Sequence, residues 1–224
     1  MTNTLHRYGK SESFRDDFIL FCIPSPGRND QGAVDKQKAF LRICAKHGPV
    51  NMGNGNRGSF RPERHLDPTS HWKRHLDPDW EGVISGVSKP GTVAAVFDTR
   101  EKAEACLREV KEADLGLSVN MSTSVSGAKE VAESCGIARH SVEYSLGFAD
   151  PHDHLPNSQV LGLSTMCGHG MVSFNMARKM LDMVREGRRT PRQAVATLAR
   201  FCPCGVYNPA RAMRLLQEAR KQSG

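Results

Sequence analysis

Hydrophobic and polar residues alternate along the first two thirds of the chain in a way that predicts both strands and helices. The run DDFILFCIP at residues 16–24 is short and apolar and predicts a strand, whereas residues 33–47 repeat apolar positions at helical spacing. Further strands are predicted at residues 92–98, 115–122, 140–148 and 159–166, and further helices at residues 99–114 and 124–136. This order predicts an α/β or α+β fold, with a mixed sheet and helices packed on it.

After residue 166 the pattern is helical throughout. Residues 170–187 predict one helix, and the pairs Thr190-Pro191 and Asn208-Pro209 each supply a capping residue and a first-turn proline for another. The three-residue loop at 187–189 is short enough to fold the first two of these helices into an antiparallel hairpin, which the terminal helix follows. The predicted organisation is therefore a disordered N-terminus at 1–14, an α/β domain at 15–166 and a C-terminal helical segment at 167–224.

One long insertion, residues 52–80, has no sustained apolar period. The sequence RHLDP occurs in it twice, and Asp followed by Pro predicts short helical turns from Asp67 and Asp77. His71 and His75 are four residues apart, so on a helix they would share a face and could chelate a metal. A polar lid with exposed histidines explains the same pattern.

Composition narrows the class of protein. Hydrophobic residues make up 38% of the chain and charged residues 25%, which is typical of a soluble globular protein. No apolar run is long enough to span a bilayer, and residues 1–11 contain no apolar segment of a secretory signal. Seven cysteines without an export signal indicate a cytoplasmic protein whose cysteines are free thiols or metal ligands.

The net charge of +7 is concentrated near the C-terminus. Residues 171–224 hold eleven Lys and Arg and three Asp and Glu, a net +8, which leaves −1 for the rest. The positive electrostatic field of such a segment attracts a small anion, an acidic protein or nucleic acid. A solvated helical surface has the same composition. Nucleic acid is not favoured, because aromatic residues are only 6% of the chain and no stacking aromatics interleave the cations.

The predicted hairpin brings two small cysteine motifs together. Helices of about 16 and 11 residues are about 24 and 17 Å long, so the chain returns close to its starting point. Cys167 and His169 should then face Cys202 and Cys204. Three cysteines and one histidine can hold zinc, and thiolate-rich sites also hold iron–sulfur clusters. Buried cysteine packing without a ligand remains the alternative.

A metal-free thiol enzyme is a further hypothesis. Cys167 is expected just before a helix N-terminus, which would lower its thiol pKa, and His169 could lower it further. The segments MCGHG and PCG also resemble the two cysteine motifs of the proline racemase family over about eight residues. That resemblance implies that Cys167 and Cys204 act as opposing acid and base at a substrate carbon. The two motifs lie much closer together here than in that family.

Other residues could bind a ligand. His152 and His154 flank Asp153 and could act as metal ligands or as a general base. Ser124 lies in a strand-to-helix loop that could hold an anion, and Arg211 and Asn208 could bind a carboxylate or phosphate at the last helix. We therefore expect an enzyme that acts on a small anionic substrate beside the Cys/His site, with a nucleic-acid-binding or scaffold protein carrying a structural zinc as the alternative.

Overall fold

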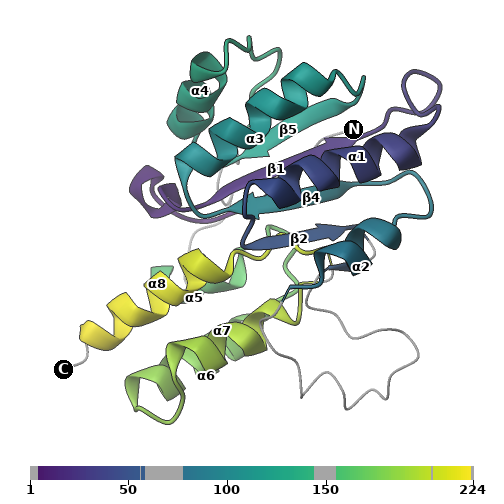
Figure 1. Cartoon of the computed structure of the whole chain (residues 1–224). Helices are drawn as coiled ribbons and strands as arrows, with labels where there is room; N and C mark the ends of the chain where they lie inside the picture. The colour runs from purple at the N-terminus through teal and green to yellow at the C-terminus, as the bar shows by residue number, and fades with distance from the viewer. Residues whose placement is uncertain (1–4, 56, 59–77, 144–154, 203, 223–224) are drawn as a thin grey trace.

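A five-stranded sheet lies at the centre of the fold (Figure 1). The computed structural model describes residues 5–55, 57–58, 78–143, 155–202 and 204–222. In these residues the strands run in the order β3-β2-β4-β1-β5, and every pairing is antiparallel. Their bounds are Phe18–Ile23 for β1, Asn51–Asn54 for β2, Arg57–Gly58 for β3, Val93–Phe97 for β4 and Ser118–Ser122 for β5.

Helices cover both faces of this sheet. A short 3-10 helix, η1, spans Ser11–Phe14, and the first four α-helices are α1 at Ala33–Lys46, α2 at Trp80–Ser85, α3 at Arg100–Ala113 and α4 at Val125–Ser134. The last four are α5 at Ser158–Ser164, α6 at Phe174–Arg185, α7 at Pro191–Ala199 and α8 at Pro209–Lys221. No helix of the described residues is long and apolar enough to cross a membrane.

The main strands and helices follow the β-α-β-β-α-β order of a ferredoxin-like unit. The α1 crossover joins β1 to β2 with β4 between them, and the α3 crossover joins β4 to β5 with β1 between them. The predicted α/β or α+β class is confirmed. The sheet is antiparallel rather than mixed, because each crossover skips a strand and its two parallel strands never become neighbours.

The alternation of side chains along β1 divides the apolar residues into two cores. Phe18, Leu20 and Cys22 face the core beneath α1, α2 and α3, whereas Ile19 and Phe21 face the core beneath the C-terminal helices. Figure 1 shows α5 to α8 gathered on one side of the sheet and α1, α3 and α4 on the other. Both faces of β1 and β4 are therefore covered, which explains why these strands are apolar almost throughout.

The predicted strand at residues 159–166 is wrong, because these residues form α5 and the turn after it. The side chain of Asn157 accepts a hydrogen bond from Val160 N and starts the helix, and α5 packs against α6 and α8. A short apolar run has no periodicity that separates a strand from a buried helix. The C-terminal helical layer therefore begins at residue 158 rather than 167.

Two further elements differ from their predicted bounds. The helix predicted at 170–187 begins only at Phe174, because Ser173 caps it by accepting a hydrogen bond from Met176 N. Residues 140–143 are not in a strand, and the rest of the predicted strand at 140–148 lies outside the described residues. The predicted turns at Asp67 and Asp77 also lie outside them.

The N-terminal segment is packed rather than disordered over residues 5–14. Leu5 contacts the core beneath the C-terminal helices, and Phe14 is buried. Asp17, fully buried, forms ion pairs with both Arg7 and Arg211, the latter at 2.9 Å. Sequence pattern missed this packing because the segment is held by charged side chains, which carry no apolar periodicity.

Candidate functional site

Two loops of the C-terminal layer meet beside the sheet. The first cysteine loop, residues 165–173, connects α5 to α6 and carries Cys167 and His169. The second cysteine loop, residues 200–208, connects α7 to α8 and carries Cys202 and Cys204. Because α6 packs against α7, the chain returns as predicted and the two loops become neighbours.

The four side chains contact one another. Cys204 Sγ lies 3.3 Å from His169 Nδ1 and 3.7 Å from Cys202 Sγ. Cys167 lies close enough to Cys202 and His169 for both side chains to influence its pKa. The three thiols and the imidazole therefore form one interacting group, which we call the ring.

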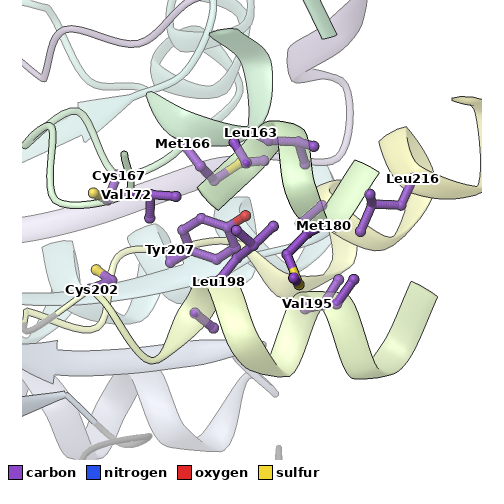
Figure 2. Close-up of a cluster of buried hydrophobic side chains, with 14 of the residues drawn as sticks. Leu163, Met166, Cys167, Val172, Met180, Val195, Leu198, Cys202, Tyr207 and Leu216 are labelled. Atoms are coloured by element: carbon purple, nitrogen blue, oxygen red, sulfur yellow. The ribbon is translucent and has the colours of Figure 1, made fainter. Parts of the chain in front are cut away.

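The ring lies at the edge of the core, with one side toward solvent. Cys167 and Cys202 are buried, Cys204 is half-buried and His169 is exposed. Figure 2 shows Cys167 and Cys202 together at one margin of the apolar cluster, whose interior holds the ring of Tyr207. The imidazole is thus the group of the ring that solvent reaches most easily.

Mutual contact perturbs the thiols. The bond with Cys202 and then burial raise the pKa of Cys167. For Cys202, the bond with Cys167 acts to lower the pKa, but the bond with Cys204 and burial outweigh it and raise the pKa to about 12. The pKa of Cys204 is lowered by its bond with Cys202, and that of His169 is raised by its bond with Cys167.

The expected activation of Cys167 by a helix N-terminus is therefore wrong. The helix starts at Phe174, seven residues later, and its first turn is capped by Ser173. The thiol with a lowered pKa is instead Cys204, on the other loop. The cause is a hydrogen bond within the ring rather than a helix dipole.

The second cysteine loop is fixed to strand β2. Asn51 Nδ2 donates a hydrogen bond to Tyr207 O at 2.7 Å, and the Asn51 side chain is buried. A Cβ atom on Gly53 would lie within 3.0 Å of Cys204 O, so the loop backbone rests directly on the strand backbone. The position of Cys204 is set by the sheet as well as by the helices.

No group of three or more His, Cys, Asp or Glu side chains in the described part of the chain is arranged to hold a metal ion as it stands. The thiols and the imidazole bond to one another instead. The donor set nevertheless matches zinc chemistry, since Cys and His are the usual ligands of tetrahedral zinc.

Arg211 does not face a ligand site. Its guanidinium is buried, donates to Asp17 Oδ2 at 2.9 Å and to Ser13 Oγ at 3.0 Å, and stacks over Phe14. The side chain of Asn208 also forms hydrogen bonds within the protein, because it caps α8 and donates to Asp17 Oδ1 at 2.9 Å. The assignment of these two residues to anion binding is corrected: an internal carboxylate occupies them both.

Ser124 caps α4 by accepting a hydrogen bond from Gly127 N at 3.1 Å. It also lines a cavity of about 660 Å³ beside the edge strand β5. The hydroxyl groups of Ser118, Ser122 and Thr123 and the guanidinium of Arg7 line the same cavity. This groove retains the features of a small-anion site.

The remaining histidine candidates, His71, His75, His152 and His154, lie outside the described residues. Comparison with known protein families, curated proteins and solved structures found no match to this chain. The functional argument therefore depends on the Cys/His ring and its surroundings.

Proposed function

We propose that this chain is a zinc-binding protein in which Cys167, His169, Cys202 and Cys204 are the four ligands of one ion. The ring of contacts supports this proposal. With zinc–sulfur bonds of about 2.3 Å, two thiolates of a tetrahedral site lie about 3.8 Å apart. The Cys202–Cys204 separation of 3.7 Å matches that spacing, and the 3.3 Å from Cys204 to His169 is close to it.

We infer that rotation of the four side chains would complete the site. Cys204 already contacts Cys202 and His169, and Cys167 is close enough to both to influence their pKa values, so turning the four donors inward would exchange these contacts for bonds to the ion. Zinc binding releases the thiol protons, because thiolate and not thiol is the ligand. A single ion also fits the spacing better than an iron–sulfur cluster, whose irons and sulfides would hold the cysteines of opposite irons further apart.

The proposed ion would have a structural role. Four protein ligands leave no open position, which is typical of structural rather than catalytic zinc. Its ligands would join the α5–α6 connection to the α7–α8 connection, and the latter is bound to β2 through Asn51 and Gly53. Zinc would thereby fix the C-terminal helical layer on the sheet.

The two-thiol mechanism is less well supported. Opposing acid and base thiols need a gap between them that admits a substrate carbon. Here Cys202 lies 3.7 Å from Cys204 and influences the pKa of Cys167, so a third thiol lies beside both of them. The resemblance to the racemase motifs therefore finds no matching arrangement of side chains.

Small-anion binding is the second candidate function. The groove beside β5 favours it, because hydroxyl groups and the buried Arg7 line a cavity of about 660 Å³ next to the N-terminus of α4. Titration with inorganic phosphate, followed by the amide resonances of residues 122–127, tests this function. Saturable shifts confined to that loop support it, and their absence at millimolar phosphate contradicts it.

Metal content tests the zinc site directly. Protein purified without chelator should contain one zinc per chain and remain colourless, and a Cys202→Ser/Cys204→Ser variant should contain none. Cys135→Ser removes a thiol outside the ring and serves as the control that keeps its zinc. A metal-free wild type that also fails to take up added Zn²⁺ would contradict the proposal. Brown protein that contains iron and sulfide would indicate an iron–sulfur cluster instead of zinc.

A further inference from the structure

The N-terminal segment packs directly on the first cysteine loop. Tyr8 N donates a hydrogen bond to Thr165 Oγ1 at 2.9 Å. Gly168, between the two ligands of this loop, has a φ of +73°, and a Cβ atom there would lie within 3.0 Å of Leu5 and His6. The loop conformation that presents Cys167 and His169 is therefore shaped against residues 5–8.

Arg7 is the centre of this contact. Its Nε donates to Met166 O at 3.0 Å, and Met166 precedes Cys167. Its Nη1 donates to Ser122 O at 3.1 Å, and its Nη2 pairs with Asp17. The side chain is only 2% exposed, so it is fixed between the sheet edge, the buried carboxylate and the cysteine loop.

Arg7 also interacts electrostatically with Cys167. The pKa of Arg7 is lowered by burial and by the charge of Arg211, and Cys167 acts on it in the opposite direction. One zinc ion with three thiolates and a neutral imidazole carries a net charge of −1. An anionic centre at the edge of the core is stabilised by a nearby buried cation, which water screens little.

We propose that Arg7 is the positioning and charge-balancing residue of the Cys/His centre. It fixes the backbone that presents Cys167 through the Met166 carbonyl, and its guanidinium offsets the negative charge of the zinc-bound thiolates. This inference rests on the proposed zinc site. Groups outside the ligand set commonly change metal affinity about 10- to 100-fold when they are removed.

Arg211 offers a matched control. It shares the Asp17 carboxylate with Arg7, stacks over the same Phe14 ring and is equally buried, at 1% exposed. Its hydrogen bonds go to Asp17, Tyr8 and Ser13 and none goes to the cysteine loop. Loss of either arginine thus leaves a comparable defect at Asp17, and of the two only Arg7 also donates to the backbone of the first cysteine loop, at Met166 O.

The experiment compares Arg7→Met with Arg211→Met in full-length protein. Zinc affinity is measured by competition with a chromophoric chelator, and the sulfur-to-metal charge-transfer band is recorded after Co²⁺ substitution. Arg7→Met should bind zinc about 10- to 100-fold more weakly than wild type. Its cobalt band should move to longer wavelength, because the thiolates lose a neighbouring positive charge. Arg211→Met should keep the wild-type affinity and band.

Two milder variants separate charge from positioning and guard against misfolding. Arg7→Lys keeps the charge and should recover the wild-type band, whereas Arg7→Gln is neutral and should not. Equal zinc affinities and unshifted bands in Arg7→Met, Arg7→Gln and Arg211→Met would overturn the role of Arg7 while leaving the zinc site in place. Failure of the wild type to bind Zn²⁺ would instead overturn the proposed function, and this inference with it.

Discussion

Gly53 of β2 and Gly205 of the second cysteine loop lie backbone against backbone. A Cβ atom on Gly53 would come within 3.0 Å of Cys204 O, and one on Gly205 would come within 3.0 Å of Met52 O. Neither position has room for a side chain, since both neighbouring atoms belong to the main chain. The pair therefore determines how closely the helical layer approaches the sheet, and with it the position of Cys204.

Gly205→Ala should destabilise the protein by more than the cost of its backbone conformation alone. Gly205 has a φ of +73°, and a non-glycine residue in that region costs about 1 to 3 kcal/mol. The collision with Met52 O adds to this cost. Gly187→Ala is the matched control, because Gly187 has a φ of +71° and no atom within 4 Å of an added Cβ. Urea unfolding measures the free energy of unfolding of both variants. Equal losses would show that the close approach of Gly53 and Gly205 does not contribute to stability.

Asp17→Asn should be among the most destabilising single changes. The Asp17 carboxylate is fully buried and pairs with both Arg7 and Arg211, so its neutralisation leaves two buried guanidinium groups uncompensated. Breaking a buried ion pair in this way costs about 3 to 5 kcal/mol. Asp16→Asn provides the comparison, because its pair with Arg214 is about one-fifth exposed and should cost about 1 kcal/mol or less. Thermal unfolding of the two variants shows which substitution lowers stability more. Similar losses of stability would contradict the central role of Asp17.

Added zinc should raise the unfolding temperature in proportion to the logarithm of its concentration. A ligand that binds only the folded chain stabilises it by about 2.7 kcal/mol at one hundred times its dissociation constant. The effect should vanish in His169→Ala/Cys204→Ala and persist in Cys135→Ser. Chelator-treated protein should keep its β-sheet signal, because the core beneath α1, α2 and α3 contains none of the four proposed ligands. An unfolding temperature that is the same with and without zinc would contradict the structural role.

Much of the fold could be predicted from sequence where local signals and packing agree. The capping pairs Thr190-Pro191 and Asn208-Pro209 start α7 and α8 as expected, because the caps act within one turn. The convergence of the two cysteine loops also followed, since a short connection leaves packed helices few alternatives. In contrast, residues 159–166 were wrongly predicted as a strand, because a buried helix of seven residues has the same apolar content as a strand.

The ion-pair and hydrogen-bond partners of the charged residues could not be predicted from the sequence. Arg211 has the composition and place of an anion-binding residue, and only the tertiary structure shows that Asp17, 194 positions away, fills that role. Arg7 gave no signal at all, since a single arginine in a polar N-terminal stretch has no periodicity. Its contacts with Met166 O and Ser122 O join parts of the chain that are 159 and 115 residues away.

Cys204 should be the first cysteine to react with iodoacetamide. Its pKa is lowered by the bond with Cys202, so the reactive thiolate is present at lower pH than for an ordinary thiol, and the labelling rate should level off at lower pH. Burial raises the pKa of Cys22 and Cys44, and Cys106 is packed 3.6 Å from Cys44, so these three should stay unlabelled in the folded protein. Peptide mapping after brief labelling across a pH series measures each site. Saturating Zn²⁺ should slow the labelling of Cys204, because metal coordination lowers the nucleophilicity of the thiolate. Labelling that is equally fast with and without zinc would place Cys204 outside the ligand set, whereas first labelling of Cys167 would contradict the assignment of the lowered pKa to the second cysteine loop.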